Sequence, residues 1–417
     1  MHVHSQYSIL DGQASIARLV DKAIANGMRG IAVTDHGDMF GIKEFFNYVN
    51  KKNGGTNAEI KELKKKIADL ESGKSGAENP EEELAACKEQ LEAARKKLFK
   101  PIFGCEMYVA RRRMTDKEGK QDQSGYHLVV LAKNLKGYHN LIKLVSKAWT
   151  QGFYMRPRTD REELKKYHEG LIVCSACLGG EVPRKITAGD FAGAEEAVRW
   201  YKDLFGDDYY LELQRHKVTD PKQRANREVY PLQEVVNKKL IEYSKKYGIR
   251  LVCTNDVHFV DEENAEAHDR LICLSTGKDL DDPNRMLYTK QEWMKTREEM
   301  NEIFADVPEA LSNTVDICDQ VEFYSIDHAP IMPNFEIPEE FGTEEGYRQK
   351  FTEKDLFDEF TRDENGNVVM DEASAKAKIE RLGGYDKLYR IKLEADYLAK
   401  LAYDGAKPVS YTHLTLP

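Results

Sequence analysis

The sequence predicts an α/β fold organised around a parallel sheet or barrel. Two observations lead to this prediction. Short apolar runs alternate with amphipathic helical segments about seven times before about residue 275. The chain also has 417 residues, of which 41% are hydrophobic and 32% charged, so it can bury the cores of two or three ordinary domains.

The predicted strands are short apolar runs bounded by polar residues. They comprise the opening HVH and residues 29–34, 101–109, 127–132, 170–174, 208–213 and 249–254. Helical patterns lie between them, as at residues 14–27, where ASIARLVDKAIANG ends in a glycine suited to a helix C-cap. Repeated strand–helix–strand units are typical of parallel α/β sheets and barrels.

Residues 54–99 interrupt this alternation with a pattern typical of two paired helices. Apolar residues recur at spacings of three and four on both sides of the turn-like ESGKSGAENPEE. They are Ile60, Leu63, Ile67 and Leu70 before it and Leu84, Cys87, Leu91, Ala94 and Leu98 after it. We therefore predict an inserted coiled-coil hairpin whose many charged side chains face solvent.

After about residue 275 the sequence changes to helices and proline-containing loops. Acidic, largely helical sequence then extends to about residue 405. We expect residues 276–405 to form a separate, mostly helical region. The final residues, 406–417, continue no helical pattern, and we expect them to be a tail outside the native fold.

Composition excludes several classes of protein. The sequence has no apolar run of 18 residues and no opening basic segment followed by an apolar one, so we expect neither a membrane span nor a secretion signal. Seven scattered cysteines favour reduced thiols and a cytoplasmic location. The net charge of -10 argues against binding duplex DNA by bulk attraction. ARRRM at residues 110–114 fits a local basic groove or, as we favour, a solvated turn.

Histidine, acidic and thiol side chains accompany one predicted strand after another. His2 and His4 are two residues apart, so on a strand they point the same way. The further candidates are Asp11, His36, Glu106, His127, Cys177, Asp256 and His258. Because functional loops meet at the carboxyl ends of parallel strands, we expect these side chains to converge. Position alone supports Glu106 and His127 less well, since the first fits mid-strand and the second begins its strand.

The residue types in this set favour a cluster of transition-metal ions. Imidazoles, carboxylates and one thiolate suit zinc, manganese or iron, and so many nitrogens disfavour a magnesium or calcium cage. Nine potential ligands exceed what one tetrahedral ion uses, so we predict two or three ions about 3.5–4 Å apart. Such ions polarise a phosphoryl group and activate water near neutral pH. The sequence therefore predicts phosphoester hydrolysis.

Ordinary structural roles remain open for individual members of this set. Asp35 fits metal binding, support of a neighbouring ligand or capping of the next helix. A lone histidine is usually a hydrogen-bonded core residue, and we assign that role to His268, which lacks a matching carboxylate spacing. No Ser-His-Asp order is present, so we expect no covalent catalysis by serine.

Several of these motifs occur in the same order in a known family. They are HVHSQYSILDG, GIAVTDHGDMFG, PIFGCEMYVA, GLIVCSACLGGEVP and VCTNDVHF, followed by LDDPNRMLYTKQEWM and PEALSNTVDICDQ. Through them the chain resembles the amino-terminal part of the alpha subunits of bacterial DNA polymerase III, whose first domain is the polymerase and histidinol phosphatase (PHP) domain. The resemblance covers almost all of residues 2–404 outside the inserted hairpin.

The resemblance implies a distorted (β/α)7 PHP barrel at residues 1–275, followed at 276–405 by the truncated start of the polymerase palm and thumb region. The ligand positions of metal-binding members match His2, His4, Asp11, His36, Glu106, His127, Cys177, Asp256 and His258. This implies a metal-bound domain able to act as a 3′–5′ exonuclease on primer ends. Within the set we assign the catalytic roles to Asp256, His258 and Glu106.

For the longer parent protein, the resemblance implies DNA synthesis with Mg²⁺ on a primer–template. It implies replisome partners such as a proofreading exonuclease and a sliding clamp, and no membrane. No Gly-Ser followed by Asp-x-Asp occurs in residues 275–417, so we expect no polymerisation by this chain alone. Two alternatives remain open: a non-catalytic scaffold stabilised by its metals, and a phosphomonoesterase of the histidinol phosphatase type.

Overall fold

The computed structural model describes residues 1–72, 74, 79–218, 224–331, 335–363 and 365–409. The chain forms two compact units, Met1–His328 and Ala329–Pro417, and each is described by itself. Among the described residues, no helix combines the length and the apolar character needed to cross a membrane. All seven cysteines are free thiols.

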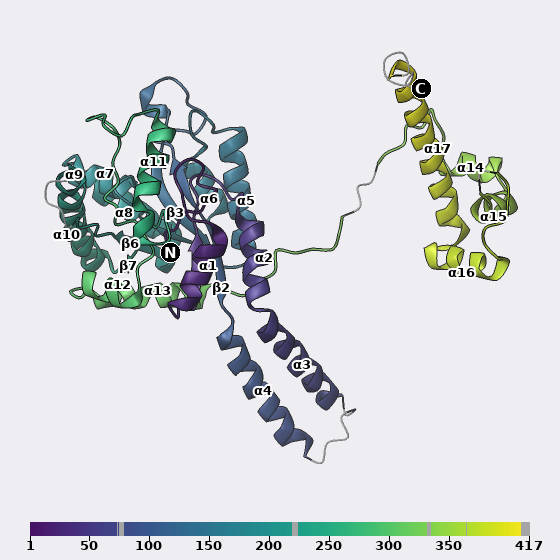
Figure 1. The fold of residues 1–417 in the computed structure, drawn as a ribbon, viewed down its shortest axis with the longest axis horizontal. Coiled ribbons are helices and arrows are strands. Elements are labelled where there is room, and N and C mark those ends of the chain that lie inside the picture. Colours follow the sequence, from purple (N-terminus) through teal and green to yellow (C-terminus); the bar gives the residue numbers. More distant parts are fainter. Residues whose placement is uncertain (73, 75–78, 219–223, 332–334, 364, 410–417) are drawn as a thin grey trace. The chain divides into compact units, whose positions relative to one another are not determined.

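A curled, seven-stranded sheet forms the centre of the first unit (Figure 1). The strand order is β1-β2-β3-β5-β6-β7, and the short β4 pairs with β2. The strands are β1 (Gly30–Val33), β2 (Lys100–Val109), β3 (Tyr126–Ala132), β4 (Arg158–Thr159), β5 (Leu171–Cys174), β6 (Tyr209–Leu213) and β7 (Arg250–Cys253). The six apolar runs after the opening HVH match β1, β2, β3, β5, β6 and β7. β4 was not predicted because two residues carry no periodic pattern.

The prediction of a parallel sheet is wrong for β3. β1 and β2, β2 and β4, β5 and β6, and β6 and β7 pair in parallel, whereas β3 is antiparallel to both β2 and β5. The connection from β2 to β3 contains only the 3-10 turn η1 (Lys120–Asp122) and lacks the helical crossover that usually joins parallel strands. The reversal places the start of β3 at the edge where the parallel strands end. His127 therefore lies at this edge although it is near the beginning of its strand.

The opening HVH segment forms an isolated bridge instead of a regular strand. Val3 pairs in parallel with Val257, which lies beyond the end of β7. The Val3 carbonyl also accepts a hydrogen bond of 2.8 Å from the amide of Thr34, which lies beyond the end of β1. The segment thus connects the two edge strands of the curled sheet and closes it. Because side chains alternate along extended chain, His2 and His4 share one side of the segment.

The inner face of the sheet changes from apolar to polar along the strands. Ala32, Ile102, Val129, Ile172, Tyr210 and Val252 belong to one buried apolar cluster. Residues an even number of positions away on the same segments are His36, Glu106, His127, Glu212 and Asp256. Because successive side chains of extended chain point to opposite faces, these polar groups continue the inner apolar rows. The barrel interior therefore leads directly into a polar mouth.

Helices cover the outer face of the sheet and bury their apolar sides against it (Figure 1). They are α1 (Ile16–Ala25), α2 (Ile42–Lys52), α5 (Leu135–Thr150), α6 (Arg161–Tyr167), α7 (Glu181–Thr187), α8 (Phe191–Phe205) and α10 (Tyr230–Tyr247), with the 3-10 turn η2 (Gly206–Asp208). The short α9 (Arg224–Glu228) packs against α10, and α11 (Ala265–Thr276) follows the 3-10 turn η3 (Glu262–Asn264). The helix predicted at 14–27 corresponds to α1.

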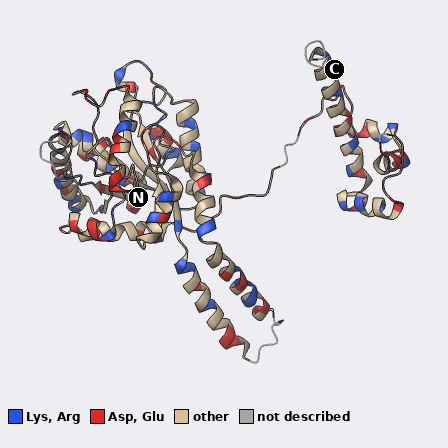
Figure 2. Ribbon diagram, in the orientation of Figure 1, with Lys and Arg blue, Asp and Glu red and all other residues tan. Residues whose placement is uncertain are grey.

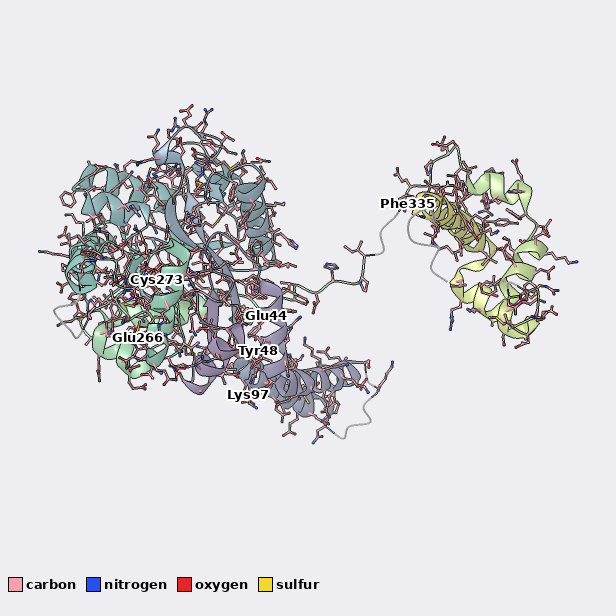
Figure 3. The ribbon with its side chains drawn as sticks, turned by 45° about the horizontal axis from the view of Figure 1, so that its top comes forward. Glu44, Tyr48, Lys97, Glu266, Cys273 and Phe335 are labelled. Atoms are coloured by element: carbon pink, nitrogen blue, oxygen red, sulfur yellow. The ribbon has the colours of Figure 1, made fainter. Side chains whose placement is uncertain are left out.

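Local sequence determines where several of these helices begin and end. The side chains of Ser15 and Asn134 accept hydrogen bonds from backbone N–H groups in the first turns of α1 and α5, as N-cap residues do. Gly248, with a φ of 61°, ends α10 in the left-handed conformation that glycine adopts readily. Glu44 of α2 is exposed to solvent, whereas Tyr48 is half-buried against the core; both are labelled in Figure 3.

The first compact unit continues past residue 275, where we expected the barrel domain to end. α12 (Arg297–Ile303) and α13 (Pro308–Gln320) belong to it. Phe304 and Ala310 are fully buried in the cluster that lies under the outer helices. Ile317 and Val321 join the apolar cluster of the barrel interior. These contacts move the boundary between the units to His328.

α3 (Gly54–Glu71) and α4 (Pro80–Lys97) form the predicted hairpin and lie side by side (Figure 1). Leu63, Leu91 and Ala94 form its buried seam, and Ile60 and Ile67 are partly buried against them. Acidic and basic side chains are spread along both helices (Figure 2). At the base of the hairpin, the Asn53 side chain and the Phe99 backbone exchange hydrogen bonds of 2.8 and 3.0 Å.

The second unit is helical and has a small core of its own. Its helices are α14 (Glu344–Lys350), α15 (Glu353–Thr361), α16 (Glu372–Leu382) and α17 (Gly384–Val409). Tyr347, Leu356, Ile379, Leu388, Tyr389 and Leu393 form the core. α17 extends past residue 406, where we expected a tail to begin. Residues 410–417 of that tail lie outside the described residues.

Candidate metal centre

All nine predicted ligands converge at the mouth where the inner face of the sheet becomes polar. His2, His4 and Asp11 come from the opening segment and its loop, and His36 follows β1. Glu106 and His127 lie in β2 and β3, Cys177 follows β5, and Asp256 and His258 follow β7. Each of these side chains lies within 4 Å of at least one other member of the set.

Glu106 occupies the centre of the cluster and is 1% exposed. One carboxylate oxygen lies 3.1 Å from His2 Nε2 and 2.9 Å from His127 Nδ1. The other lies 2.6 Å from His36 Nδ1 and 3.6 Å from His4 Nε2. β2 extends beyond the end of β1, which is why a mid-strand residue reaches the mouth. This extension explains how Glu106 lies within its strand and still reaches the mouth.

Asp256 approaches the same two opening histidines from the other side. Its Oδ1 lies 3.2 Å from His2 Nε2 and 3.3 Å from His4 Nε2. The residue has a φ of 48°, in the left-handed region that non-glycine residues seldom adopt. Ala176, next to Cys177, and Leu10, next to Asp11, are also left-handed, with φ of 63° and 61°. Such backbone strain is typical of sites where geometry is held for a function.

Asp11, His36 and His258 form the more open side of the cluster. Asp11 Oδ2 lies 2.8 Å from His36 Nε2 and 3.9 Å from His258 Nε2. The side chains of Asp11 and His36 are 23% and 16% exposed, whereas that of Glu106 is 1% exposed. Cys177 Sγ lies 3.5 Å from His127 Nδ1, and the His127 side chain is 21% exposed. A molecule entering from solvent would therefore meet this side first.

The donor atoms fit metal ions. Three overlapping groups each bring three ligand atoms within 4.8 Å of one another: His4, His36 and His258; His2, His4 and Glu106; and His36, Glu106 and His127. Two ligands about 2.1 Å from one tetrahedral ion lie about 3.4 Å apart, close to the separations around Asp256 and Glu106. Five buried atoms also lack a hydrogen-bond partner in the described structure: His2 Nε2, His4 Nε2, His36 Nδ1, Glu106 Oε2 and Asp256 Oδ1. They face the position that ions would occupy.

The protein orients the deep histidines through their other ring nitrogens. His2 Nδ1 lies 2.7 Å from Glu212 Oε1, and His4 Nδ1 lies 2.9 Å from the hydroxyl of Ser8. That hydroxyl donates to Asp35. With the proton on Nδ1, each Nε2 keeps its lone pair for a metal ion. Asp35, whose role was left open, thus supports the His4 environment and caps no helix; the N-cap of α2 is Gly41.

Electrostatics in the cluster favour cations among its carboxylates. Burial would raise the pKa of Glu106, but His127, His2 and His36 hold it well below its usual value. Burial opposes protonation of His2, yet Asp256, Glu212 and Glu106 raise its pKa well above the usual value. Protons therefore compensate these carboxylates when no metal does. Because ions would displace those protons, we expect metal binding to weaken in acid.

Burial shifts the pKa of His4 and that of the Cys177 thiol in opposite directions, with different consequences for metal binding. Burial, together with His36 and His258, lowers the pKa of His4 to about 3, so the imidazole stays neutral, which is the form that ligates metal. Burial raises the pKa of the Cys177 thiol well above its usual value, with help from Glu106 and Asp256. This thiol would become a ligand only by losing its proton to a bound cation.

The sequence missed three residues at the site. Glu212 contacts His2, and the Tyr288 hydroxyl lies 3.0 Å from Asp11 Oδ1 and 3.3 Å from His258 Nε2. His268 was assigned an ordinary core role; it is 1% exposed, but its ring centroid lies 5.5 Å from that of His258. Glu212 had a signal, an acid within the buried strand YYLEL. Tyr288 lies in a loop and His268 in α11, where no periodic pattern indicates contact with the site.

The arginine turn at residues 110–114 is largely neutralised by neighbouring acids. Arg112 forms ion pairs with Asp122 and Glu118, at 2.5 and 3.0 Å. Arg113 pairs with Asp116 at 3.0 Å. Arg111 donates a hydrogen bond to the Gln121 carbonyl and lies over the Tyr126 ring, without an ion pair to a described residue. Two of the three arginines are thus neutralised, which agrees with a solvated basic turn.

Comparison with known proteins gives the family of the chain and several relatives. The family model described as the PHP domain matches residues 1–216. The DNA polymerase III subunit alpha of Borreliella burgdorferi is 39% identical over 84% of this chain and 26% of its own length. That of Treponema pallidum is 36% identical over 91% of this chain and 27% of its own length. That of Campylobacter jejuni is 30% identical over 97% of this chain and 30% of its own length.

The chain therefore spans between about a quarter and a third of the length of these relatives. The similarity extends well beyond the matched domain, since 357 residues align with the Borreliella burgdorferi protein. The domain match itself includes seven of the nine candidate ligands and covers just over half of the 417 residues. The chain belongs to the PHP domain family.

Proposed function

We propose that this chain is the amino-terminal region of a bacterial DNA polymerase III alpha subunit whose PHP domain hydrolyses phosphodiester bonds at the 3′ ends of DNA. The observation that carries the proposal is the convergence of nine ligand-competent side chains at one mouth of the barrel, six of which form three overlapping groups of close ligand atoms. Two or three ions of zinc, manganese or iron suit this donor set.

We assign the ions to His2, His4, Asp11, His36, Glu106, His127, Cys177, Asp256 and His258. When bound, they supply Lewis acidity toward a phosphoryl group and activate water. The deep carboxylates of Glu106 and Asp256 balance their charge, and His258 lies 3.8 Å from Asp256 and 3.9 Å from Asp11 at the open side. Asp256, His258 and Glu106 are therefore the residues whose loss we expect to abolish hydrolysis.

The test is hydrolysis of a primer with a mismatched 3′ end by the purified chain with Mn²⁺ or Zn²⁺. We expect nucleotide release that stops with chelator and in Asp256→Asn. Asp203→Asn, which changes an exposed aspartate of α8, is the matched control and should keep full activity. Hydrolysis that survives both chelation and Asp256→Asn would exclude this centre as its source.

A metal-stabilised scaffold is the second candidate function, because the buried unpartnered atoms at the centre would destabilise the fold without ions. It predicts that chelation lowers the melting temperature without any nuclease activity being present. Turnover of histidinol phosphate or another phosphomonoester would favour a third function. We rank it lower because the similarity to polymerase subunits continues far beyond residue 216.

For the longer protein we propose DNA synthesis on a primer–template with Mg²⁺. The basis is the printed name of the relatives, which are about three to four times longer than the region matched here. Contacts with a separate proofreading exonuclease and a sliding clamp, and a cytoplasmic location, belong to the same proposal. Co-purification of the full-length protein with such subunits would test it.

A further inference from the structure

Three exposed aromatic side chains form a continuous row beside the metal centre. Phe40, Trp149 and Phe153 are 54%, 39% and 44% exposed. The ring centroids of Phe40 and Trp149 lie 5.7 Å apart, and those of Trp149 and Phe153 lie 5.5 Å apart with the planes at 20°. Aromatic rings that pack on one another while remaining exposed offer flat apolar surface to a ligand.

The row is attached directly to the residues of the centre. The Trp149 indole N–H donates a 2.8 Å hydrogen bond to the carbonyl of Gly37, the residue after His36. The Gly37 amide in turn donates to the carbonyl of Glu106 at 2.9 Å. These bonds fix the indole in one orientation at the end of α5. The platform is therefore held in place before any ligand arrives.

The backbone around Gly37 ties the row to the next turn of the chain. Gly37 has a φ of 67°, and a Cβ there would lie 2.7 Å from Pro157 Cγ. Met155, between Phe153 and Pro157, is 66% exposed and has a φ of 64°, which is strained for a non-glycine residue. The turn that carries Phe153 is thus pressed against the loop that carries His36.

An exposed cation, Arg156, lies near the centre and three residues after Phe153. Arg156 forms no ion pair with any described residue, in contrast to the neutralised arginines at 112 and 113. Its guanidinium lies 6.0 Å from the Tyr108 ring centroid. The Tyr108 ring lies 6.2 Å from that of His36 and 5.2 Å from that of His127. The positive charge is therefore next to the open side of the cluster.

We propose that Phe40, Trp149 and Phe153 form a stacking platform for the unpaired terminal bases of single-stranded DNA, and that Arg156 contacts the adjoining phosphate. The proposal rests on the phosphodiesterase function proposed above and adds its substrate selectivity. Stacked aromatic rings beside a cation are the combination that binds single-stranded nucleic acid without sequence preference. Binding of a protein would not require stacked rings at regular spacing or a cation beside the proposed phosphodiesterase centre, so these features favour single-stranded DNA as the ligand.

This platform has a consequence for substrate choice. Bases in a duplex stack on one another and are not available to protein rings, so a terminus must unpair before it can bind. A mismatched end unpairs at lower cost than a matched one. The platform would therefore favour mismatched or frayed 3′ ends over paired ones.

The binding test uses the full chain and a fluorescein-labelled single-stranded decanucleotide, followed by anisotropy in EDTA and again in Mn²⁺. We expect Trp149→Ala and Phe153→Ala each to weaken binding by about tenfold, the usual scale for losing one stacked base. Trp149→Phe should keep most of the affinity because it keeps a ring. Phe191→Ala, which removes an aromatic side chain 49% exposed on α8, is the matched control.

An oligonucleotide with abasic 3′-terminal positions separates base stacking from phosphate contact. The unmodified chain should bind it about tenfold more weakly than the normal oligonucleotide, and Trp149→Ala should lose this preference. Arg156→Gln should weaken binding of both oligonucleotides alike. Equal affinities of the unmodified chain, Trp149→Ala and Phe153→Ala for the normal oligonucleotide would overturn the proposal.

Hydrolysis of bis(p-nitrophenyl) phosphate distinguishes failure of this proposal from failure of the proposed function. That diester reports on the centre without extended DNA, so Trp149→Ala should reduce the ratio of kcat/KM for the decanucleotide to kcat/KM for the small diester. If Trp149→Ala is active and this ratio is unchanged, the platform proposal is wrong and the phosphodiesterase function stands. If the chain hydrolyses neither substrate but its binding of DNA still depends on Trp149, the phosphodiesterase function is wrong and the platform stands.

Discussion

At the scale of single residues, the candidate metal centre depends on side chains that contact its ligands from behind. The ring nitrogens of His2 and His4 that point away from the cluster contact Glu212 and Ser8. Glu212 is 2% exposed and also accepts hydrogen bonds from Thr254 and Gln214, at 2.5 and 3.0 Å. This fixed network holds the imidazole of His2 in a single tautomer and rotamer.

Glu212→Gln tests this support. The amide keeps the shape of the carboxylate but loses its charge, so His2 becomes a weaker and less well oriented ligand. We expect metal affinity to fall by about 10- to 100-fold. Competition with a fluorescent chelator measures it. Glu242→Gln, which changes an exposed glutamate of α10, should retain the original affinity. Unchanged affinity in Glu212→Gln would remove Glu212 from the support of the site.

Lys295 is a buried charge outside the centre and makes the stability of the first unit depend on pH. Its side chain is 5% exposed, and burial lowers its pKa from 10.5 to about 8. Below pH 8 the lysine is charged in both states, and the cost of burying the charge is present in full. Between about pH 8 and 10.5 the folded chain has released a proton that the unfolded chain still binds, so the free energy of unfolding rises with pH.

Lys295→Met should therefore raise the free energy of unfolding most at neutral pH, where the unmodified chain buries a charged lysine. We expect the stability difference between the variant and the unmodified chain to shrink by up to about 3 kcal/mol as the pH rises from 7.5 to 10.5. Urea unfolding followed by tryptophan fluorescence measures it, because all three tryptophans lie in the first unit. Lys136→Met, at a side chain 60% exposed, should show no such change. A constant difference across this pH range would contradict a buried ammonium group.

Residue type and strand position led to the nine candidate ligands, although position alone supported Glu106 and His127 less well, and their role in binding metal stays a prediction. His36, Asp256 and His258 follow strands, and that signal is local in the sequence. Glu212 was overlooked although it alternates with the buried Tyr210, because no motif directed attention to it. Tyr288 reaches the centre from a loop far along the chain. Such a contact depends on tertiary packing, which no local pattern contains.

At the scale of elements, strand positions were predictable and strand direction was not. An apolar run has the same composition whichever way it is traversed, so nothing in HLVVLA indicates that β3 is reversed. The clue was the absence of a predicted helix between β2 and β3, since parallel crossovers usually carry one. The reversal matters for function because it brings His127 to Glu106, at 2.9 Å.

The hairpin of α3 and α4 has a narrow seam, so one substitution should loosen it. Leu91 is 8% exposed and packs with Leu63 and Ala94. Leu91→Ala should destabilise the hairpin by about 2 kcal/mol or more, while metal content stays the same. Hydrogen exchange of the α3 and α4 amides measures this. Glu89→Ala, at an exposed position of α4 without an ion pair to a described residue, is the control. Faster exchange throughout the barrel would mean that the hairpin and the barrel unfold together.

At the scale of the whole molecule, the barrel interior has two ends with different contents. The carboxyl ends of the parallel strands lead to the candidate metal centre, and the apolar interior packs against α13. Ile317, Cys318 and Val321 join the inner cluster, and the Asn313 side chain donates a 2.7 Å hydrogen bond to the Leu251 carbonyl. The sequence showed α13 as a helix but gave no indication that it packs against the barrel, so the extent of the first compact unit to His328 could not be predicted.

This arrangement predicts which shortened chains fold. A chain ending at His328 should remain soluble, bind metal and unfold at the same temperature as the full chain, because it keeps the whole compact unit. A chain ending at Ser275 lacks seven buried apolar side chains, Met294, Phe304, Val307, Ala310, Ile317, Cys318 and Val321. At about 1.5–3 kcal/mol for a large apolar side chain, their loss is comparable to the total stability of a domain, about 5–15 kcal/mol. We therefore expect that shorter chain to aggregate or unfold, as thermal scans and size-exclusion chromatography would show. If instead it folded and kept its metals, the barrel would be independent of α13, and the packing of that helix would serve the region that follows it.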